Sequence, residues 1–97
     1  MVIGYARSAE INGDKLAKQL QKLLNAGASD VIQEYTSGIG EKPELNKLLE
    51  RMSVGDTLLV SNYEALGRET REVTRILALM KQKEINLIIL DQIGSGA

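Results

Sequence analysis

The hydrophobic pattern of this chain alternates between two periods, and that alternation restricts the fold more than any other feature. Short apolar runs of strand length occur at residues 2–6, 30–35, 57–61 and 85–90. Between them, apolar residues recur with helical spacing. A strand followed by a helix, repeated three times and closed by a final strand, favours a mainly parallel sheet with helices on both faces. We therefore predict an α/β three-layer sandwich with a sheet of four or five strands.

Each predicted helix carries one apolar stripe. The stripes consist of Leu16, Leu20, Leu23 and Leu24, then Leu45, Leu48, Leu49 and Met52, and finally Val73, Ile76, Leu77 and Met80. Asp14 fits the N-cap of the first helix and Gly27 its C-cap, whereas Pro43 fits the first position of the second. Leu79 lies off the third stripe. We expect the striped faces to be buried and Leu79 to be exposed.

Composition limits the chemistry that is available. The 97 residues suffice for one compact domain, which we place at residues 1–97, and 43% of them are hydrophobic. The chain has no Cys and no His, which excludes disulfides, thiol nucleophiles and the usual nitrogen and sulfur metal ligands. We expect no metal and no cofactor. Neither a membrane-spanning apolar run nor a secretory leader is present, so we expect a cytoplasmic protein without membrane contact.

Charge argues against a domain that binds DNA by itself. The formal net charge is −1, whereas a free-standing electrostatic DNA binder shows a basic excess or a clustered basic face. Arg68, Arg71 and Arg75 are spaced as one basic stripe that could contact phosphate. Glutamates interleave with this stripe, so a solvated face of ion pairs is an equal alternative. Any contact with DNA therefore needs a local cluster or an additional domain.

The predicted strand ends define a candidate site. Ligands of open parallel sheets bind beyond the carboxyl ends of the strands, which here are the loops at residues 7–13, 36–42 and 61–69. The polar residues of these loops include Arg7, Ser8, Ser37, Lys42, Glu64 and Arg68. The topology thus brings them together at one edge of the sheet. For Arg7, a surface ion pair is the alternative to a phosphate contact.

Several motifs, in the same order, resemble those of one family over about 90 residues. They are Tyr5-Ala6-Arg7, the segment 16–27 with Gln19, Ser37-Gly38, Lys42-Pro43-Glu44-Leu45, Gly55-Asp56-Thr57-Leu58-Leu59-Val60 and Glu64-Ala65-Leu66-Gly67-Arg68. This pattern resembles the catalytic domain of the serine site-specific recombinases, the resolvase and invertase family. The resemblance implies a serine that attacks a DNA phosphate, without metal or nucleotide cofactor. It also implies homodimers or homotetramers assembled through a long helix, and a C-terminal DNA-binding domain, both of which we expect outside residues 1–97.

The resemblance also assigns roles to individual residues. It implies catalytic roles for Arg7, Ser37, Glu64 and Arg68, and phosphate contacts for Arg7, Lys42, Arg68 and Arg71. Guanidinium groups suit this task because they clamp phosphate oxygens bidentately without titrating. The chain departs from the family pattern at the nucleophile and at charged positions of the site. Ala9 stands at the nucleophile, Ala65 and Lys42 replace arginines, and Glu64 replaces an aspartate.

These departures lead to two hypotheses. Under the first, the domain has lost strand cleavage and acts through protein–protein contact or regulation of DNA transactions. Under the second, Ser8 serves as the nucleophile through a local bulge. Side chains alternate across a strand, so Tyr5, Arg7 and position 9 share one face, whereas Ser8 points to the other, where a turn role is its alternative. An unrelated small-ligand domain is a third class, but no acidic triad or dinucleotide glycine motif supports a small-molecule substrate.

Overall fold

The computed structural model describes residues 1–8, 14–35, 43–67 and 69–91. Within them, strands and helices alternate as the sequence predicts. The elements are β1 (Val2–Ser8), α1 (Asp14–Asn25), β2 (Asp30–Tyr35), α2 (Pro43–Arg51), β3 (Thr57–Val60), the 3₁₀ helix η1 (Tyr63–Ala65), α3 (Thr70–Gln82) and β4 (Asn86–Ile89). The η1 helix lies within residues 61–69, which the sequence predicts as a loop. A single 3₁₀ turn is too short to show a periodic pattern.

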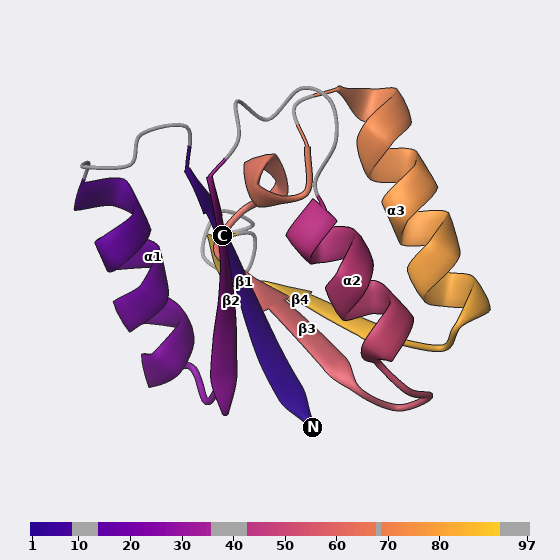
Figure 1. The fold of residues 1–97 in the computed structure, drawn as a ribbon, viewed down its shortest axis with the longest axis horizontal. Helices are drawn as coiled ribbons and strands as arrows, with labels where there is room; N and C mark the ends of the chain where they lie inside the picture. The colour runs from indigo at the N-terminus through magenta and orange to yellow at the C-terminus, as the bar shows by residue number, and fades with distance from the viewer. Residues whose placement is uncertain (9–13, 36–42, 68, 92–97) are drawn as a thin grey trace.

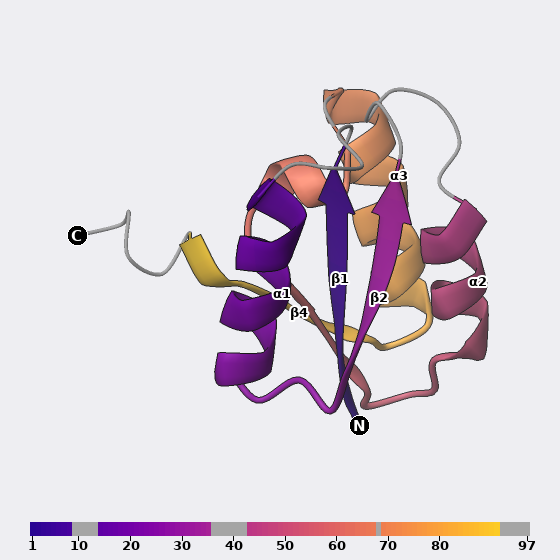
Figure 2. The ribbon, with the colours of Figure 1, turned by 60° about the vertical axis from the view of Figure 1, so that its left-hand side comes forward.

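The strands form one parallel sheet in the order β2-β1-β3-β4. Helix α1 covers one face of the sheet, and α2 and α3 cover the other (Figure 1). The view in Figure 2 shows β1 and β2 running side by side with their carboxyl ends toward the same edge. The predicted three-layer α/β sandwich is confirmed. No helix in the described segments is both long and apolar enough to cross a membrane.

The alternation of side chains along β1 divides the hydrophobic core into two parts. Ile3 and Tyr5 belong to the larger part, under α2 and α3, whereas Ala6 belongs to the part under α1. Gly4 also faces α1, and a Cβ at this position would lie 3.1–3.2 Å from side-chain atoms of Val31 and Leu23. A side chain at this position would therefore crowd α1 and β2, whereas glycine leaves room for their close packing.

The observed ends of the helices and strands agree with the predicted ends to within one or two residues. Gly27 adopts φ 106°, and the N–H groups of Gly27 and Ala28 donate to the carbonyls of Leu24 and Leu23, a Schellman arrangement. Pro43 is the first residue of α2. Asp14 is the first helical residue of α1 rather than the predicted N-cap. The strands predicted at 57–61 and 85–90 are each slightly shorter, ending at Val60 and spanning Asn86–Ile89.

The apolar stripe of α1 is narrower than predicted. Leu16 and Leu23 are buried, Leu20 is only half-buried, and Leu24 is 44% exposed. At 100° per residue, Leu24 lies about 80° around the helix from Leu16, outside the part that touches the sheet. The stripe of α2 is buried as expected. In α3, Ile76 and Met80 are buried, Val73 and Leu77 are half-buried against the core, and Leu79 is 39% exposed as predicted.

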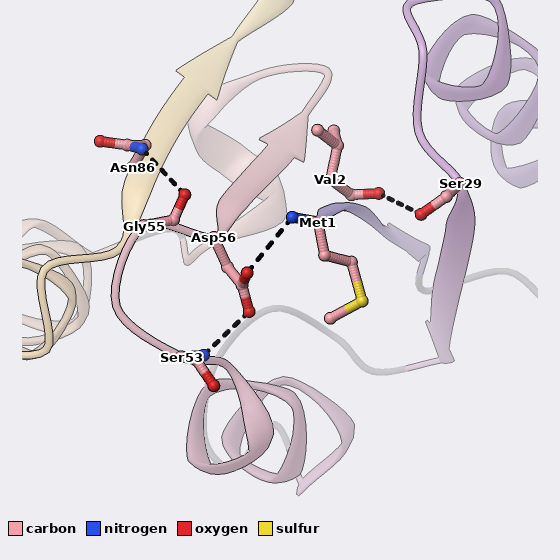
Figure 3. Close-up of polar contacts among 7 residues, drawn as sticks. All are labelled: Met1, Val2, Ser29, Ser53, Gly55, Asp56 and Asn86. Carbon is pink, nitrogen blue, oxygen red and sulfur yellow. Dashed lines mark hydrogen bonds and ion pairs between the residues drawn. The ribbon is translucent and has the colours of Figure 1, made fainter.

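The amino ends of the strands are fastened together by polar contacts (Figure 3). The N-terminal amine of Met1 lies 3.3 Å from Asp56 Oδ1, and the backbone N–H of Ser53 donates to Asp56 Oδ2 at 2.9 Å. The hydrogen bond from Ser53, followed by the amine, holds the pKa of Asp56 below its usual value. Asn86 donates to the carbonyl of Gly55 at 3.3 Å. These contacts leave the opposite edge of the sheet for a functional site.

Candidate functional site

Arg7 is the centre of the candidate site at the carboxyl edge of the sheet. It lies on the same face of β1 as Tyr5, under η1, and only 9% of its surface is exposed. Its Nη2 atom donates to the backbone carbonyl of Glu64, the middle residue of η1. The structure therefore joins two of the predicted site segments, β1 and the segment after β3, through a buried guanidinium.

Gln19 of α1 holds the backbone of Arg7 from the other side of the sheet. Its Oε1 accepts from the Arg7 N–H at 3.2 Å, and its Nε2 donates to the Arg7 carbonyl at 2.9 Å. A side-chain amide can satisfy both backbone groups of one residue because it carries a donor and an acceptor. Gln19 thus fixes the backbone of β1 close to its carboxyl end.

Ser8 lies on the opposite face of β1 from Arg7. The register of β1 and β2 continues without interruption from Ile3↔Asp30 to Ser8↔Tyr35, so the strand alternates regularly through Ser8. Ser8 is only 5% exposed. Its side chain therefore faces the α1 layer, and the parity predicted for Ser8 relative to Tyr5 and Arg7 is the one observed. Ala9 lies outside the described residues.

Glu34 is a buried carboxylate that the sequence analysis missed. It is 4% exposed, and its register partner on β1 is Arg7, so the two share the face under α2. Glu34 Oε1 accepts from the Tyr5 hydroxyl at 2.5 Å and from the Leu45 N–H at 3.2 Å. Glu34 Oε2 accepts from the Glu44 N–H at 2.8 Å. Three donors therefore compensate the burial of this charge.

Glu34 accepts hydrogen bonds from backbone N–H groups at the N-terminus of α2 that have no partner within the helix. Pro43, the first residue of the helix, has no N–H, so the first free donors are those of Glu44 and Leu45. A carboxylate at a helix N-terminus also interacts favourably with the helix dipole. The sequence signal was the shared parity of Glu34 and Ile32, which places Glu34 on a buried face of β2.

Tyr5 responds to this environment. Burial, then the hydrogen bond to Glu34 and the charge of that carboxylate, raise the pKa of the Tyr5 hydroxyl far above its usual value. The phenol thus remains protonated and acts as a donor. Tyr5, Glu34 and the first turn of α2 form one hydrogen-bonded unit beside Arg7.

The remaining predicted site residues are distributed unevenly. Ala65 is 2% exposed and belongs to the core under α2 and α3, whereas Glu64 and Arg71 are exposed. Three predicted site residues lie outside the described residues, namely Ser37, Lys42 and Arg68. Of the predicted cluster, the described part of the chain therefore brings together Arg7 and η1.

An open groove of about 440 Å³ runs between η1 and the first turns of α3. Its lining includes Tyr63, Glu64, Glu69 and Thr70. The described lining carries two carboxylates, which repel a phosphate, and Arg68 lies outside the described residues. A phosphate at this edge would need cationic side chains, and the described lining of the groove contains none.

Comparison with known proteins settles the family. Residues 2–96 match the family model described as "Resolvase, N terminal domain". The chain belongs to the resolvase family. This resolvase domain is 34% identical to the DNA-invertase of Escherichia phage P1 over 87 residues, which are 89% of this chain and 46% of that protein. It is 30% identical to the serine recombinase gin of Escherichia phage Mu, covering 89% of this chain and 45% of that protein.

Solved structures share the fold of the resolvase domain. The first open reading frame of transposon ISC1904 from Sulfolobus solfataricus P2 matches with a TM-score of 0.76 at 24% identity, covering 92% of this chain and 66% of that one. The C-terminal catalytic domain of IS1535 TnpA, an IS607-like serine recombinase, matches with a TM-score of 0.73 at 21% identity, covering 93% and 70%. The resolvase domain spans about half the length of the curated relatives it matches.

Proposed function

We propose that this resolvase domain does not cleave DNA and acts instead through protein–protein contact or by regulating DNA transactions. The observation that carries the proposal is the placement of hydroxyl groups around Arg7. The position that would hold the nucleophile is Ala9, whose methyl group cannot attack phosphorus. The adjacent hydroxyl, that of Ser8, is buried on the opposite face of β1 from the Arg7 side chain.

The surroundings of Arg7 support the same proposal. Phosphoryl transfer spreads negative charge over the phosphate oxygens, and arginines around the phosphate stabilise that charge. Ala65 occupies one position where the family pattern has arginine, and its side chain is part of the core. Arg7 itself is largely buried and donates to the carbonyl of Glu64. A nucleophile restored at position 9 would therefore meet an incomplete set of cations.

Contact with DNA would have to come from elsewhere. The net charge of −1 and the acidic lining of the groove beside η1 give this domain little attraction for a phosphate backbone. We propose that any DNA target is recognised by another domain or by a partner protein. The resolvase domain would then contribute assembly or regulation.

Under the rival hypothesis, the domain retains DNA-cleaving activity and Ser8 is the nucleophile. This hypothesis requires the end of β1 to rotate or bulge, so that the Ser8 hydroxyl reaches the face of Arg7. The unbroken β1–β2 register through Ser8 and the burial of Ser8 weigh against this rearrangement.

A search for a covalent protein–DNA adduct tests the proposal. The domain is fused to the DNA-binding domain of an active resolvase and incubated with a nicked duplex that carries the matching target, and the products are separated on a denaturing gel. We expect no adduct from the wild-type sequence. The matched variants are Ser8→Ala and Ala9→Ser, with the P1 DNA-invertase as the positive control. An adduct from the wild type that disappears in Ser8→Ala would overturn the proposal.

A further inference from the structure

The β2 strand forms one edge of the sheet. In the described part of the chain, β2 pairs with β1 on one side only. Its six residues make it longer than the other edge strand, β4, which has four. The unpaired backbone groups of an edge strand are a template for pairing, and proteins usually protect them with Lys, Pro or a bulge. Asp30–Tyr35 contains neither Lys nor Pro.

A groove of about 360 Å³ follows this edge. Ile32 of β2, half-buried, contributes an apolar surface, and α2 contributes Glu44, Lys47, Glu50 and Arg51. All four of these charged residues are exposed. Along α2 these four charges alternate in sign, from Glu44 in the first turn through Lys47 and Glu50 to Arg51 at the end of the helix.

We propose that β2 pairs with β2 of a second copy of this chain, antiparallel, around a two-fold axis at Gln33. The two four-stranded sheets then form one continuous sheet of eight strands. A two-fold interface brings the same surface together on both copies, so each contact occurs twice. The proposal concerns a surface at the side of the sheet. Of the hydrogen-bonded unit beside Arg7 it uses only the side chain of Glu44, whose backbone N–H binds Glu34.

The side chains of β2 suit this pairing. With the axis at Gln33, Val31 lies opposite Tyr35 of the second copy, on the face that carries α1. An aromatic side chain opposite a β-branched one is a favourable cross-strand pair. Tyr35 is 50% exposed in the single chain, so the pairing would cover an apolar surface that is otherwise in water.

The charges of α2 suit it as well. The same two-fold axis sets the two α2 helices side by side and antiparallel, because α2 packs against β2 in each copy. Glu44 near the start of one helix then lies toward Arg51 at the end of the other. Within one chain, the carboxylate of Glu44 lies 3.8 Å from Lys47 Nζ, an exposed pair of the kind that contributes little to stability. The outer face of α2 is thus complementary to itself.

Disulfide trapping tests the strand pairing. The chain has no cysteine, so a single Gln33→Cys substitution introduces the only thiol. Directly opposed residues of antiparallel strands have Cα atoms about 4.5–5.5 Å apart, which a disulfide can span. We expect Gln33→Cys to form a covalent dimer under mild oxidation. The control is Gln21→Cys, at an equally exposed position on α1, which should remain monomeric.

Charge exchange tests the α2 contact. In sedimentation equilibrium, we expect Arg51→Glu to weaken the dimer about tenfold, because two ion pairs become like-charge contacts. Adding Glu44→Arg to Arg51→Glu should restore the wild-type dissociation constant. Arg75→Glu, on the exposed face of α3, is the matched control and should change nothing.

Each result of these experiments either supports or overturns the proposed β2–β2 dimer. A concentration-dependent dimer, trapped by Gln33→Cys and rescued by the charge exchange, supports the proposal. A wild-type chain that stays monomeric at about 1 mM overturns it. So does a dimer that Gln33→Cys does not trap or that Arg51→Glu does not weaken. Circular dichroism of each variant confirms that it is folded. Because these variants keep Arg7, Ser8 and Ala9 unchanged, the results are independent of the result for DNA cleavage.

Discussion

The buried pair of Tyr5 and Glu34 shows how one residue of the strand β2 can organise its neighbours. Glu34 receives hydrogen bonds from the Tyr5 hydroxyl and from the first free N–H groups of α2. A buried carboxylate is stable only while such donors surround it. Removing a donor therefore costs more than the loss of an ordinary surface hydrogen bond.

We expect Tyr5→Phe to lower the free energy of unfolding by about 1.5–3 kcal/mol, the range for hydrogen bonds to charged groups. The phenyl ring preserves packing, so the loss isolates the hydroxyl. Urea unfolding followed by circular dichroism measures it. Tyr63→Phe, at a position that is 44% exposed, is the control and should leave stability nearly unchanged. Equal effects of the two substitutions would contradict the role assigned to the Tyr5–Glu34 bond.

Asp56 gives the molecule a pH dependence at its other end. Its pKa in the folded protein lies below the ordinary value of 3.8, mainly because Ser53 donates to it. A lowered pKa means that the stabilisation is complete above that ordinary value and is lost as pH falls through the folded pKa. We expect the urea midpoint of the wild type to fall more steeply below about pH 4 than that of Asp56→Asn. Parallel curves for the two proteins would refute this assignment.

Ala65 provides a test, at the level of one side chain, of the proposal that the site has lost its catalytic arginine. It is 2% exposed within the core under α2 and α3. We expect Ala65→Arg, which restores the family pattern, to destabilise the fold by at least about 1 kcal/mol, because a larger and charged side chain must be accommodated. Thermal unfolding measures the change, with Glu64→Asp as an exposed control from the same motif. An unchanged melting temperature would mean that position 65 can open toward the site.

At the scale of elements, the two helix ends closed by Schellman hydrogen bonds differ in one residue. After α3, the N–H groups of Glu84 and Ile85 donate to the carbonyls of Lys81 and Met80, and Glu84 adopts φ 58°. The corresponding position after α1 is Gly27. A left-handed conformation is costly for any residue that has a Cβ.

We expect Glu84→Gly to raise the free energy of unfolding by about 0.5–1 kcal/mol, since relief of strain exceeds the added entropy of the unfolded chain. Gly27→Ala should lower it by about 1 kcal/mol or more, because no atom crowds that position and the effect is conformational alone. Chemical denaturation of both variants measures the contrast. Effects of the same sign would contradict the conformational explanation.

Elements that depend on periodicity were predictable from the sequence, and those that depend on a distant partner were not. The apolar runs around Tyr5 and Leu58 and the helical stripes fixed the order and the parallel sheet, and the motifs pointed to the family that comparison confirms. The burial of Arg7 was not predictable, because it depends on η1, 57 residues away in the chain. The alternation along β2 indicates that Glu34 is buried, but its hydrogen-bond partners were not predictable. Its donors come from other elements.

At the scale of the whole molecule, the two ends of the sheet differ in character. Polar contacts close the amino end, whereas the carboxyl end carries Arg7, η1 and an acidic groove. The candidate site thus lies at the carboxyl edge of a parallel sheet, beside a groove whose described lining carries two carboxylates. This arrangement is consistent with the proposed role in assembly or regulation.

We expect the 97-residue chain to bind a labelled non-specific DNA duplex only weakly, with a dissociation constant above about 100 µM at physiological salt. The net charge of −1 provides little counterion release. Fluorescence anisotropy over a range of salt concentrations measures this, with the same chain fused to a resolvase DNA-binding domain as the control. Tight, steeply salt-dependent binding by the chain alone would contradict the charge argument.

The central place of β1 has a consequence for biosynthesis. β1 is made first, yet it lies between β2 and β3, and β4 joins only at the far side of β3. As the chain leaves the ribosome, one side of β1 must therefore wait without a partner until residues 57–60 emerge. Such distant pairings make folding slower than in a helical bundle of equal length. The nascent chain is thus exposed to mispairing at β1 until β3 has emerged, and β1 is the described strand most in need of protection.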